Sequence, residues 1–329
     1  MLRFFRSSGS TVSVVIILIG GLTWLHALSG YEPPYSGKYG AFLFFEIAGW
    51  LTDTPVLSVC FGLILLLTVA TLLIFANNRL RLIDKISYLP ALCYVLLVGG
   101  VTELHRFNPV VIATILLIAA FVLLVGSFKS ERLSYNFFTV SALISAATFF
   151  YQYMYIYMLV VWFAILFWRP GYWREWVFSL LGFAFPLFLA FSWFFLMDDD
   201  YARMGVFLRE IFSIQRITVS LSVAAIVFST ASLLMVIITF GHLMRYLGLK
   251  KVIVRNGYYI LILMAVITVV PTILLPDTFP FVWYLLAFPM SFVLSNYLAT
   301  VKPVRWGTIV LSLLFIGVAV VQAIFLFAG

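Results

Sequence analysis

The chain has 329 residues, of which 64% are hydrophobic, 18% aromatic and only 10% charged. Soluble domains carry about 25% charged residues, so the charged side chains are too few here to cover a water-facing surface. The 34 Phe, 17 Tyr and 9 Trp exclude a disordered or fibrous chain, because they would have to lie in water. The composition therefore indicates a polytopic integral membrane protein, with apolar residues facing lipid as well as filling the core.

The apolar runs predict an all-α helical bundle with about eleven transmembrane helices. A helix needs about 20 predominantly apolar residues to cross a bilayer, and lipid offers no partner to an unpaired backbone group. The connections are short, so a single transmembrane domain over residues 1–329 is the simplest organisation. The predicted spans cover residues 10–29, 55–76, 88–107, 109–127, 137–151, 154–168, 177–197, 217–243, 257–275, 280–298 and 307–327.

The basic residues predict the orientation. If the amino terminus starts in the cytoplasm, 15 of the 20 Lys and Arg residues fall on the inner side. Cytoplasmic connections of membrane proteins carry an excess of Lys and Arg, which gives an N-in, C-out chain. The net charge of +8 then reflects orientation and gives no reason to invoke nucleic acid. The outer basic residues are Lys38, Arg106, Arg203, Arg209 and Arg216.

Two of the predicted spans, residues 137–151 and 154–168, are short. Each is about 22 Å long as a helix, which is less than the roughly 30 Å of a hydrocarbon core. Between them lies the tyrosine-rich segment 151–157. One interpretation is an aromatic belt at the outer tip of a hairpin. The other is a re-entrant or unwound segment that lines a cavity, because tyrosine at every second position does not form a helical stripe.

The outer connections contain two predicted interfacial helices, near residues 39–52 and 201–215. The first is rich in Phe and Trp, and Glu46 is its only charge. Glu32, Glu46 or Asp53 could present a carboxylate to a lipid-linked substrate, or could simply be solvated acids at headgroup level. Three aspartates at 198–200 precede the second helix and are predicted to cap it. Arg203, Arg209 and Arg216 could contact phospholipid or a lipid-linked diphosphate.

The densest polar cluster at a helix end is Glu103, His105 and Arg106, in the predicted outer turn before Pro109. A carboxylate, an imidazole and a guanidinium within four residues could transfer protons or bind a phosphate, whereas any tight turn also needs polar residues. The sequence contains no metal-binding or cofactor motif. Cys60 and Cys93 are predicted to lie in opposite leaflets, beyond the reach of a disulfide, as small core hydrophobes.

Short motifs at Asn78-Arg79, Leu89–Tyr94, Trp173–Trp176, Leu181-Gly182 and Pro186 resemble those of a family of polytopic inner-membrane proteins from Bacteroidota that has no known function. More remotely, the first seven spans look like the membrane core of C-type glycosyltransferases, which would occupy residues 1–200 and leave additional helices in 201–329. That resemblance implies polyprenyl-phosphate-sugar substrates and an essential acid in the first outer loop, where Glu32 is the nearest positional match and Asp53 the second. The usual acidic pair directly after the first span is absent, as is an extramembrane acceptor-binding domain.

The sequence leads to three functional hypotheses. The leading one is a non-catalytic subunit of bacterial envelope machinery in the cytoplasmic (inner) membrane, acting in assembly, secretion or polymer handling. Such a subunit would bind membrane lipids, including polyprenyl-linked ones, or other envelope membrane proteins through its outer polar face. The first alternative is the glycosyltransferase, with Glu32 or Asp53 as its acid/base. The second is a flippase or transporter of an uncharged or amphiphilic substrate, since the helix interiors hold no charge to couple an ion.

Overall fold

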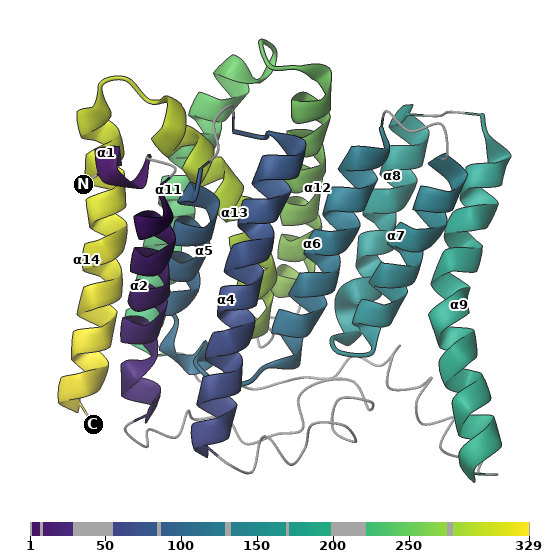
Figure 1. Ribbon diagram of the computed structural model, residues 1–329, viewed down its shortest axis with the longest axis horizontal. Coiled ribbons are helices and arrows are strands. Elements are labelled where there is room, and N and C mark those ends of the chain that lie inside the picture. Colours follow the sequence, from purple (N-terminus) through teal and green to yellow (C-terminus); the bar gives the residue numbers. More distant parts are fainter. Residues whose placement is uncertain are drawn as a thin grey trace.

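A computed structural model describes residues 2–6, 9–28, 55–83, 87–128, 133–168, 171–198, 222–274 and 279–328, and within these ranges the regular structure is entirely helical. Figure 1 shows a bundle of helices that run roughly parallel or antiparallel to one another. The helices are α1 (Leu2–Phe5), α2 (Ser10–Leu28), α4 (Pro55–Leu80), α5 (Leu89–Gly99), η1 (Thr102–Leu104), α6 (Pro109–Ser127), α7 (Leu133–Thr148), η2 (Gln152–Tyr157), α8 (Met158–Trp168), α9 (Trp173–Asp198), α11 (Val223–Leu247), α12 (Val252–Leu274), α13 (Phe279–Thr300) and α14 (Val304–Ala328).

Each apolar run that was predicted to cross the membrane contains a helix. Seven described helices are long and apolar enough to span a bilayer, and three shorter stretches are also apolar helices. The protein is therefore a helical, multi-pass membrane protein, while the count of eleven crossings stays a prediction. Helices α11 and α12 extend several residues further towards the basic end than predicted. Arg245 and Arg255 lie in these extensions, where long side chains can keep their charge in the headgroup region.

Helices α5 and α13 form the centre of the bundle. Every residue of α5 is buried, and α13 is buried along almost its whole length. Phe121 of α6 packs edge-on against Phe288 of α13, with ring centroids 5.4 Å apart. Helix α9 lies at the edge of the bundle (Figure 1) and exposes large apolar side chains such as Phe188 and Leu196. This outer surface is apolar because it faces hydrocarbon instead of water.

The predicted third span, residues 88–107, is wrong as a continuous helix. Helix α5 ends at Gly99, and its cap residue Gly100 leads into the single 3-10 turn of η1. Eleven helical residues extend only about 16 Å, so α5 crosses roughly half of a 30 Å core. The chain then returns through α6, which begins at Pro109. In this connection, residues 101–105, 107 and 108 are buried, so it lies against the protein interior.

The tyrosine-rich segment is the 3-10 helix η2, between α7 and α8. Tyr151, Tyr153 and Tyr157 are buried, and the Tyr157 hydroxyl hydrogen-bonds the Thr268 hydroxyl of α12 at 2.5 Å. The segment is thus unwound from the α-helical geometry and packs against the bundle. The rings of these three tyrosines belong to the hydrophobic core, and the choice between an outer aromatic belt and a segment that lines a cavity stays open.

Close packing joins α7 to α9 at the edge of the bundle. Gly182 of α9 lies against the backbone of Phe138 of α7, so closely that a Cβ atom there would overlap the Phe138 carbonyl group. Small residues allow two helix backbones to approach in a membrane, where dispersion and not water exclusion drives their association. Of the two cysteines, Cys93 is a buried core residue as predicted, but Cys60 is exposed on the surface of α4.

The amino-terminal helix α1 is fastened to the bundle through Arg6. The Arg6 guanidinium donates to the Leu298 carbonyl at 2.8 and 2.5 Å and to the Val301 carbonyl at 3.4 Å. These carbonyls lie at the end of α13, where a positive charge is also favoured by the helix dipole. Burial lowers the pKa of this guanidinium, although an arginine stays protonated at neutral pH.

The described basic residues other than Arg106 gather at one end of the bundle, which is the end that carries α1 in Figure 1. Their arrangement agrees with the bias that led to the N-in prediction, and the orientation itself stays a prediction. The residues are Arg6, Arg79, Arg81, Arg174, Arg245, Lys250, Lys251, Arg255, Lys302 and Arg305.

Candidate functional site

The structure describes three of the predicted site residues, Glu103, His105 and Arg106, in the connection between α5 and α6. The others, which are Glu32, Asp53, Arg203, Arg209 and Arg216, lie outside the described residues, as do the predicted interfacial helices at 39–52 and 201–215. The candidate site is therefore built around the connection of residues 100–108, which we call the polar turn.

Local sequence explains why the chain reverses at the polar turn. Gly100 ends α5, and its backbone N–H donates to the Leu96 carbonyl at 3.2 Å. At the other side, the Asn108 side chain accepts a hydrogen bond from Val110 N–H at 2.9 Å and so caps the start of α6. Pro109 occupies the first helical turn, where its missing N–H has no helical partner to lose.

Polar side chains from distant helices hold the polar turn and the end of α5 in place. On α13, the Trp283 indole N–H donates to the Leu97 carbonyl at 2.8 Å, and the Tyr284 hydroxyl donates to the Leu104 carbonyl at 2.6 Å. On α14, the Gln322 amide donates to the Gly99 carbonyl at 3.0 Å. These hydrogen bonds pair carbonyl groups that have no partner within the helix or turn. The pairing is needed because buried backbone groups have no access to water.

The Glu103 carboxylate connects the polar turn to the start of α11. Its Oε1 accepts a hydrogen bond from Ser222 N–H at 2.7 Å, and its Oε2 accepts a weaker one from the Thr102 hydroxyl at 3.4 Å. Ser222 in turn caps α11 by accepting from Ala225 N–H at 3.2 Å. The carboxylate therefore lies at the positive end of a helix dipole, which favours its negative charge although the side chain is only 2% exposed.

His105 is buried and stacks on Trp24 of α2, with ring centroids 4.9 Å apart and an angle of 17° between the rings. Gly62 of α4 allows this arrangement, because a Cβ atom there would lie 2.7 Å from the Trp24 ring and 2.8 Å from the Arg106 backbone. The Ser58 hydroxyl accepts a hydrogen bond from Phe107 N–H at 3.2 Å. The polar turn thus joins helices α2, α4, α11 and α13, and the adjoining end of α5 is bonded to α14.

These contacts bury Glu103 and His105 in the bundle, while the binding role expected of them stays a prediction. Both side chains are buried against protein, and Arg106 is half-buried. A polar residue beside a helix end has the same sequence signature whether it meets water or another helix, which is why the sequence did not distinguish the two. Among the described residues, no group of three or more His, Cys, Asp and Glu side chains is placed to hold a metal ion.

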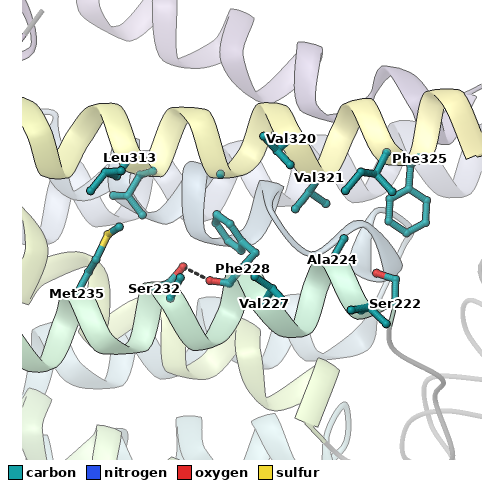
Figure 2. Close-up of a pocket in the computed structure, with 15 residues that line it drawn as sticks. Ser222, Ala224, Val227, Phe228, Ser232, Met235, Leu313, Val320, Val321 and Phe325 are labelled. Carbon is teal, nitrogen blue, oxygen red and sulfur yellow. Dashed lines mark hydrogen bonds between the residues drawn. The ribbon is translucent and has the colours of Figure 1, made fainter.

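A membrane-facing groove lies next to the polar turn, between α11 and α14, and has a cavity volume of about 590 Å³. We call it the α11–α14 groove. Figure 2 shows that it runs from Ser222 and Phe325 at one end to Met235 and Leu313 at the other. Among the described residues that line it, only Ser222 and Ser232 have polar side chains, and the Ser232 hydroxyl donates a hydrogen bond to the Phe228 carbonyl at 2.7 Å.

Phe228 forms the floor of the groove and separates it from the polar turn. Its ring points from α11 towards α14 (Figure 2) and is only 6% exposed. The ring fits because its neighbours are glycines. A Cβ atom on Gly100 would overlap the ring, and one on Gly317 of α14 would lie 3.0 Å from it. The groove and the polar turn are therefore opposite sides of one packed unit.

Sequence reasoning missed the residues that hold this unit together, Ser222, Trp283, Tyr284 and Gln322. One signal could have found the last of them, because Gln322 is the only side-chain amide in the final apolar run. A polar group in such a run needs a partner within the protein. The tryptophan and tyrosine carry no comparable signal, since both are common in every part of this chain.

Comparison of the chain with models of protein families, with curated proteins and with solved structures finds no match.

Proposed function

We propose that this protein is a non-catalytic, multi-pass subunit of bacterial envelope machinery that binds a hydrocarbon chain of a membrane lipid in the α11–α14 groove. Its role would be in assembly, secretion or polymer handling in the cytoplasmic membrane. The lipid, and not a diffusible substrate, is the proposed ligand, because the groove opens on the side of the bundle that faces hydrocarbon.

The shape and lining of the α11–α14 groove carry this proposal. Met235 lies thirteen positions after Ser222, so the groove extends about 20 Å along α11. One leaflet contributes about half of a 30 Å hydrocarbon core, and a single lipid chain therefore fits along the groove. Val223 and Val227 form an exposed rim, with 78% and 61% of their surface accessible, while Phe228 forms a closed floor. Binding would cover the apolar rim and bring the lipid headgroup to the level of Ser222.

The contacts of the polar turn support a structural role for Glu103 and His105 over an acid/base role for these two side chains. The Glu103 carboxylate is engaged by the Ser222 backbone N–H and the Thr102 hydroxyl, and His105 is stacked on Trp24. An acid/base pair needs hydrogen-bond reach to the reacting group of a substrate. Here, the Glu103 side chain is hydrogen-bonded to the start of α11 and the His105 ring is packed against α2.

The test is lipid retention by the full-length chain purified in mild detergent, measured by mass spectrometry of the extracted lipids. Ala231→Trp places an indole in the groove, since Ala231 lines it and is exposed. Ile238→Trp is the matched control, on the same helix and 73% exposed, but outside the groove lining. We expect the unmodified protein and the control to retain lipid and to bring down stoichiometric partner proteins.

The Ala231→Trp variant should lose most of the retained lipid while it unfolds at the same temperature as the control. Equal retention in both variants would show that the groove holds no lipid. Recovery of a polyprenyl-phosphate sugar, together with loss of function on Glu32→Ala or Asp53→Ala substitution, would instead support the glycosyltransferase hypothesis.

A transporter of an amphiphilic substrate is the second candidate, and the broken helix α5 favours it. Secondary transporters build binding sites near the bilayer midplane from discontinuous helices, and α5 ends at Gly99 beside the polar turn. Reconstitution in liposomes with a fluorescent lipid tests this candidate. Transfer of the lipid between leaflets above the rate in empty liposomes would favour transport, and an unchanged rate would exclude it for that lipid.

A further inference from the structure

A second pocket lies between α8 and α12, and its chemistry differs from that of the α11–α14 groove. Its cavity volume is about 750 Å³. Aromatic side chains line one wall, including Phe163, Phe167 and Trp168, whereas Asn256 and Tyr259 of α12 add polar groups to the other. The pocket is open at its rim, where Phe167 is 79% exposed, and closed at its floor by Ala164 and Ile260.

The pocket begins at the basic end of the bundle and extends towards the membrane centre. Asn256 lies in the second turn of α12, which starts at Val252, and Val266 lines the pocket at its deeper end. Val266 lies ten positions after Asn256, a helical rise of about 15 Å, which is close to the thickness of hydrocarbon in one leaflet. The pocket therefore matches a single lipid chain in the leaflet opposite to that of the α11–α14 groove.

Two basic residues lie near the polar end of the pocket, Arg255 in the first turn of α12 and Lys251 directly before that helix. The Lys251 carbonyl accepts a hydrogen bond from Arg255 N–H at 3.0 Å, so Lys251 continues the row that Arg255 and the pocket residue Tyr259 form at intervals of four residues. Helical side chains lean towards the helix amino terminus, so the Arg255 guanidinium extends from α12 in the direction of Lys251, away from the apolar end of the pocket. Lys251 is exposed and Arg255 is half-buried.

The order of groups along the pocket is the order of groups along a phospholipid. Two cations stand outermost, followed by an amide and a tyrosine hydroxyl, then by aromatic rings, and finally by aliphatic side chains. Aromatic residues favour the boundary between headgroups and hydrocarbon, and basic pockets between transmembrane helices on the cytoplasmic side bind anionic headgroups. A neutral lipid would leave the cations unused, and a soluble anion would leave the apolar wall uncovered.

We propose that the α8–α12 pocket binds one anionic phospholipid, with its phosphate at Lys251, Arg255 and Asn256 and one acyl chain between Phe163 and Val266. This site is separate from the α11–α14 groove in its helices, its leaflet and its preference for charge. It does not depend on the proposed function, because a subunit, an enzyme or a transporter could each carry it.

The experiment measures lipid affinity of the full-length chain by native mass spectrometry, with dioleoyl phosphatidylglycerol and dioleoyl phosphatidylcholine as probes. Each basic residue near a membrane surface contributes about 1 kcal/mol to attraction of anionic lipid, which is about five-fold in affinity. The K251Q/R255Q double variant should therefore bind phosphatidylglycerol about 25-fold more weakly. Its affinity for phosphatidylcholine should stay unchanged, and inorganic phosphate should compete with neither lipid.

The matched control is K302Q/R305Q, which removes two exposed charges at the same end of the bundle but outside the pocket. It should bind both lipids as the unmodified chain does. A second variant, Val266→Trp, fills the deep end of the pocket and should weaken phosphatidylglycerol binding with all the charges intact. Equal affinity for the two lipids, an equal loss in both charge variants, or unchanged binding by Val266→Trp would each overturn the proposal.

Discussion

Replacing Glu103 with alanine should destabilise the protein, because it removes the acceptor that joins the polar turn to α11. The carboxylate accepts Ser222 N–H at 2.7 Å and is 2% exposed. Leaving a buried donor without its acceptor costs about 1–3 kcal/mol. Removing a negative charge from the start of a helix costs about 0.3–1 kcal/mol, and up to about 2 kcal/mol in partly buried geometries. Together these losses predict a destabilisation of about 1.3–5 kcal/mol.

Glu103→Gln separates the contribution of the hydrogen bond to Ser222 N–H from that of the negative charge at the start of α11. Glutamine keeps a carbonyl oxygen that can accept Ser222 N–H, but it lacks the charge, so only the helix-dipole contribution of about 0.3–2 kcal/mol should be lost. The expected order of stability is unmodified chain, Glu103→Gln and then Glu103→Ala. Thr102→Val is a useful comparison, because its 3.4 Å hydrogen bond to Glu103 is weak and its loss should cost less than about 1 kcal/mol.

Thermal unfolding in a mild detergent, followed by intrinsic tryptophan fluorescence, measures this order. A carboxylate that serves catalysis predicts a different pattern, in which both substitutions abolish activity and the melting temperature hardly changes. An unchanged melting temperature for Glu103→Ala would refute the structural role. A Glu103→Gln variant that is as unstable as Glu103→Ala would show that charge, and not the hydrogen bond, holds α11.

Three further predictions concern the rest of the bundle. Gly182→Leu should separate α9 from α7 and lower the melting temperature, because a leucine side chain has no space at that contact. Gly126→Ala is the control and should be neutral or stabilising, because nothing lies within 4 Å of a Cβ atom there. An unchanged melting temperature for Gly182→Leu would contradict the close approach of the two helices. Arg6→Met should destabilise the chain by about 1–3 kcal/mol in thermal unfolding, because the carbonyl of Leu298 loses a charged donor, and Arg6→Lys should recover only part of the loss. Lys302→Cys, in a chain whose native cysteines are replaced by serine, should react with a membrane-impermeant thiol reagent only after the cells are opened; labelling in intact cells would reverse the predicted orientation.

The amino-acid sequence was sufficient to locate the helices, because lipid imposes a simple local rule. Backbone groups in hydrocarbon must be paired within the protein, so a long apolar run has to be helical. Each predicted run accordingly contains a described helix, including α13, whose interior proline Pro289 does not end it. The gathering of basic residues at one end follows from the same sequence-local information, since each charge lies near a helix terminus.

The end of helix α5 is a feature that the local sequence did not predict in full. Residues 88–107 were predicted as one span, but the helix ends at Gly99. Gly100 marks that end in the sequence, whereas the ring of Phe228 beside Gly100 and the hydrogen bond from Gln322 to the Gly99 carbonyl could not be predicted from it. Both partners are more than 100 positions away in the chain. A pattern that is read along the chain records only how apolar a residue is, and not which helix covers it.

The membrane class, the helical segments and the charge asymmetry of this protein were thus determined by its sequence, because each depends on a residue and its near neighbours in hydrocarbon. Only the tertiary structure decided that Glu103 is buried at the start of α11, that His105 stacks on Trp24 and that the α11–α14 groove exists. These features depend on pairs of residues such as Glu103 and Ser222, which are 119 positions apart. Their contact exists only when the intervening helices have packed.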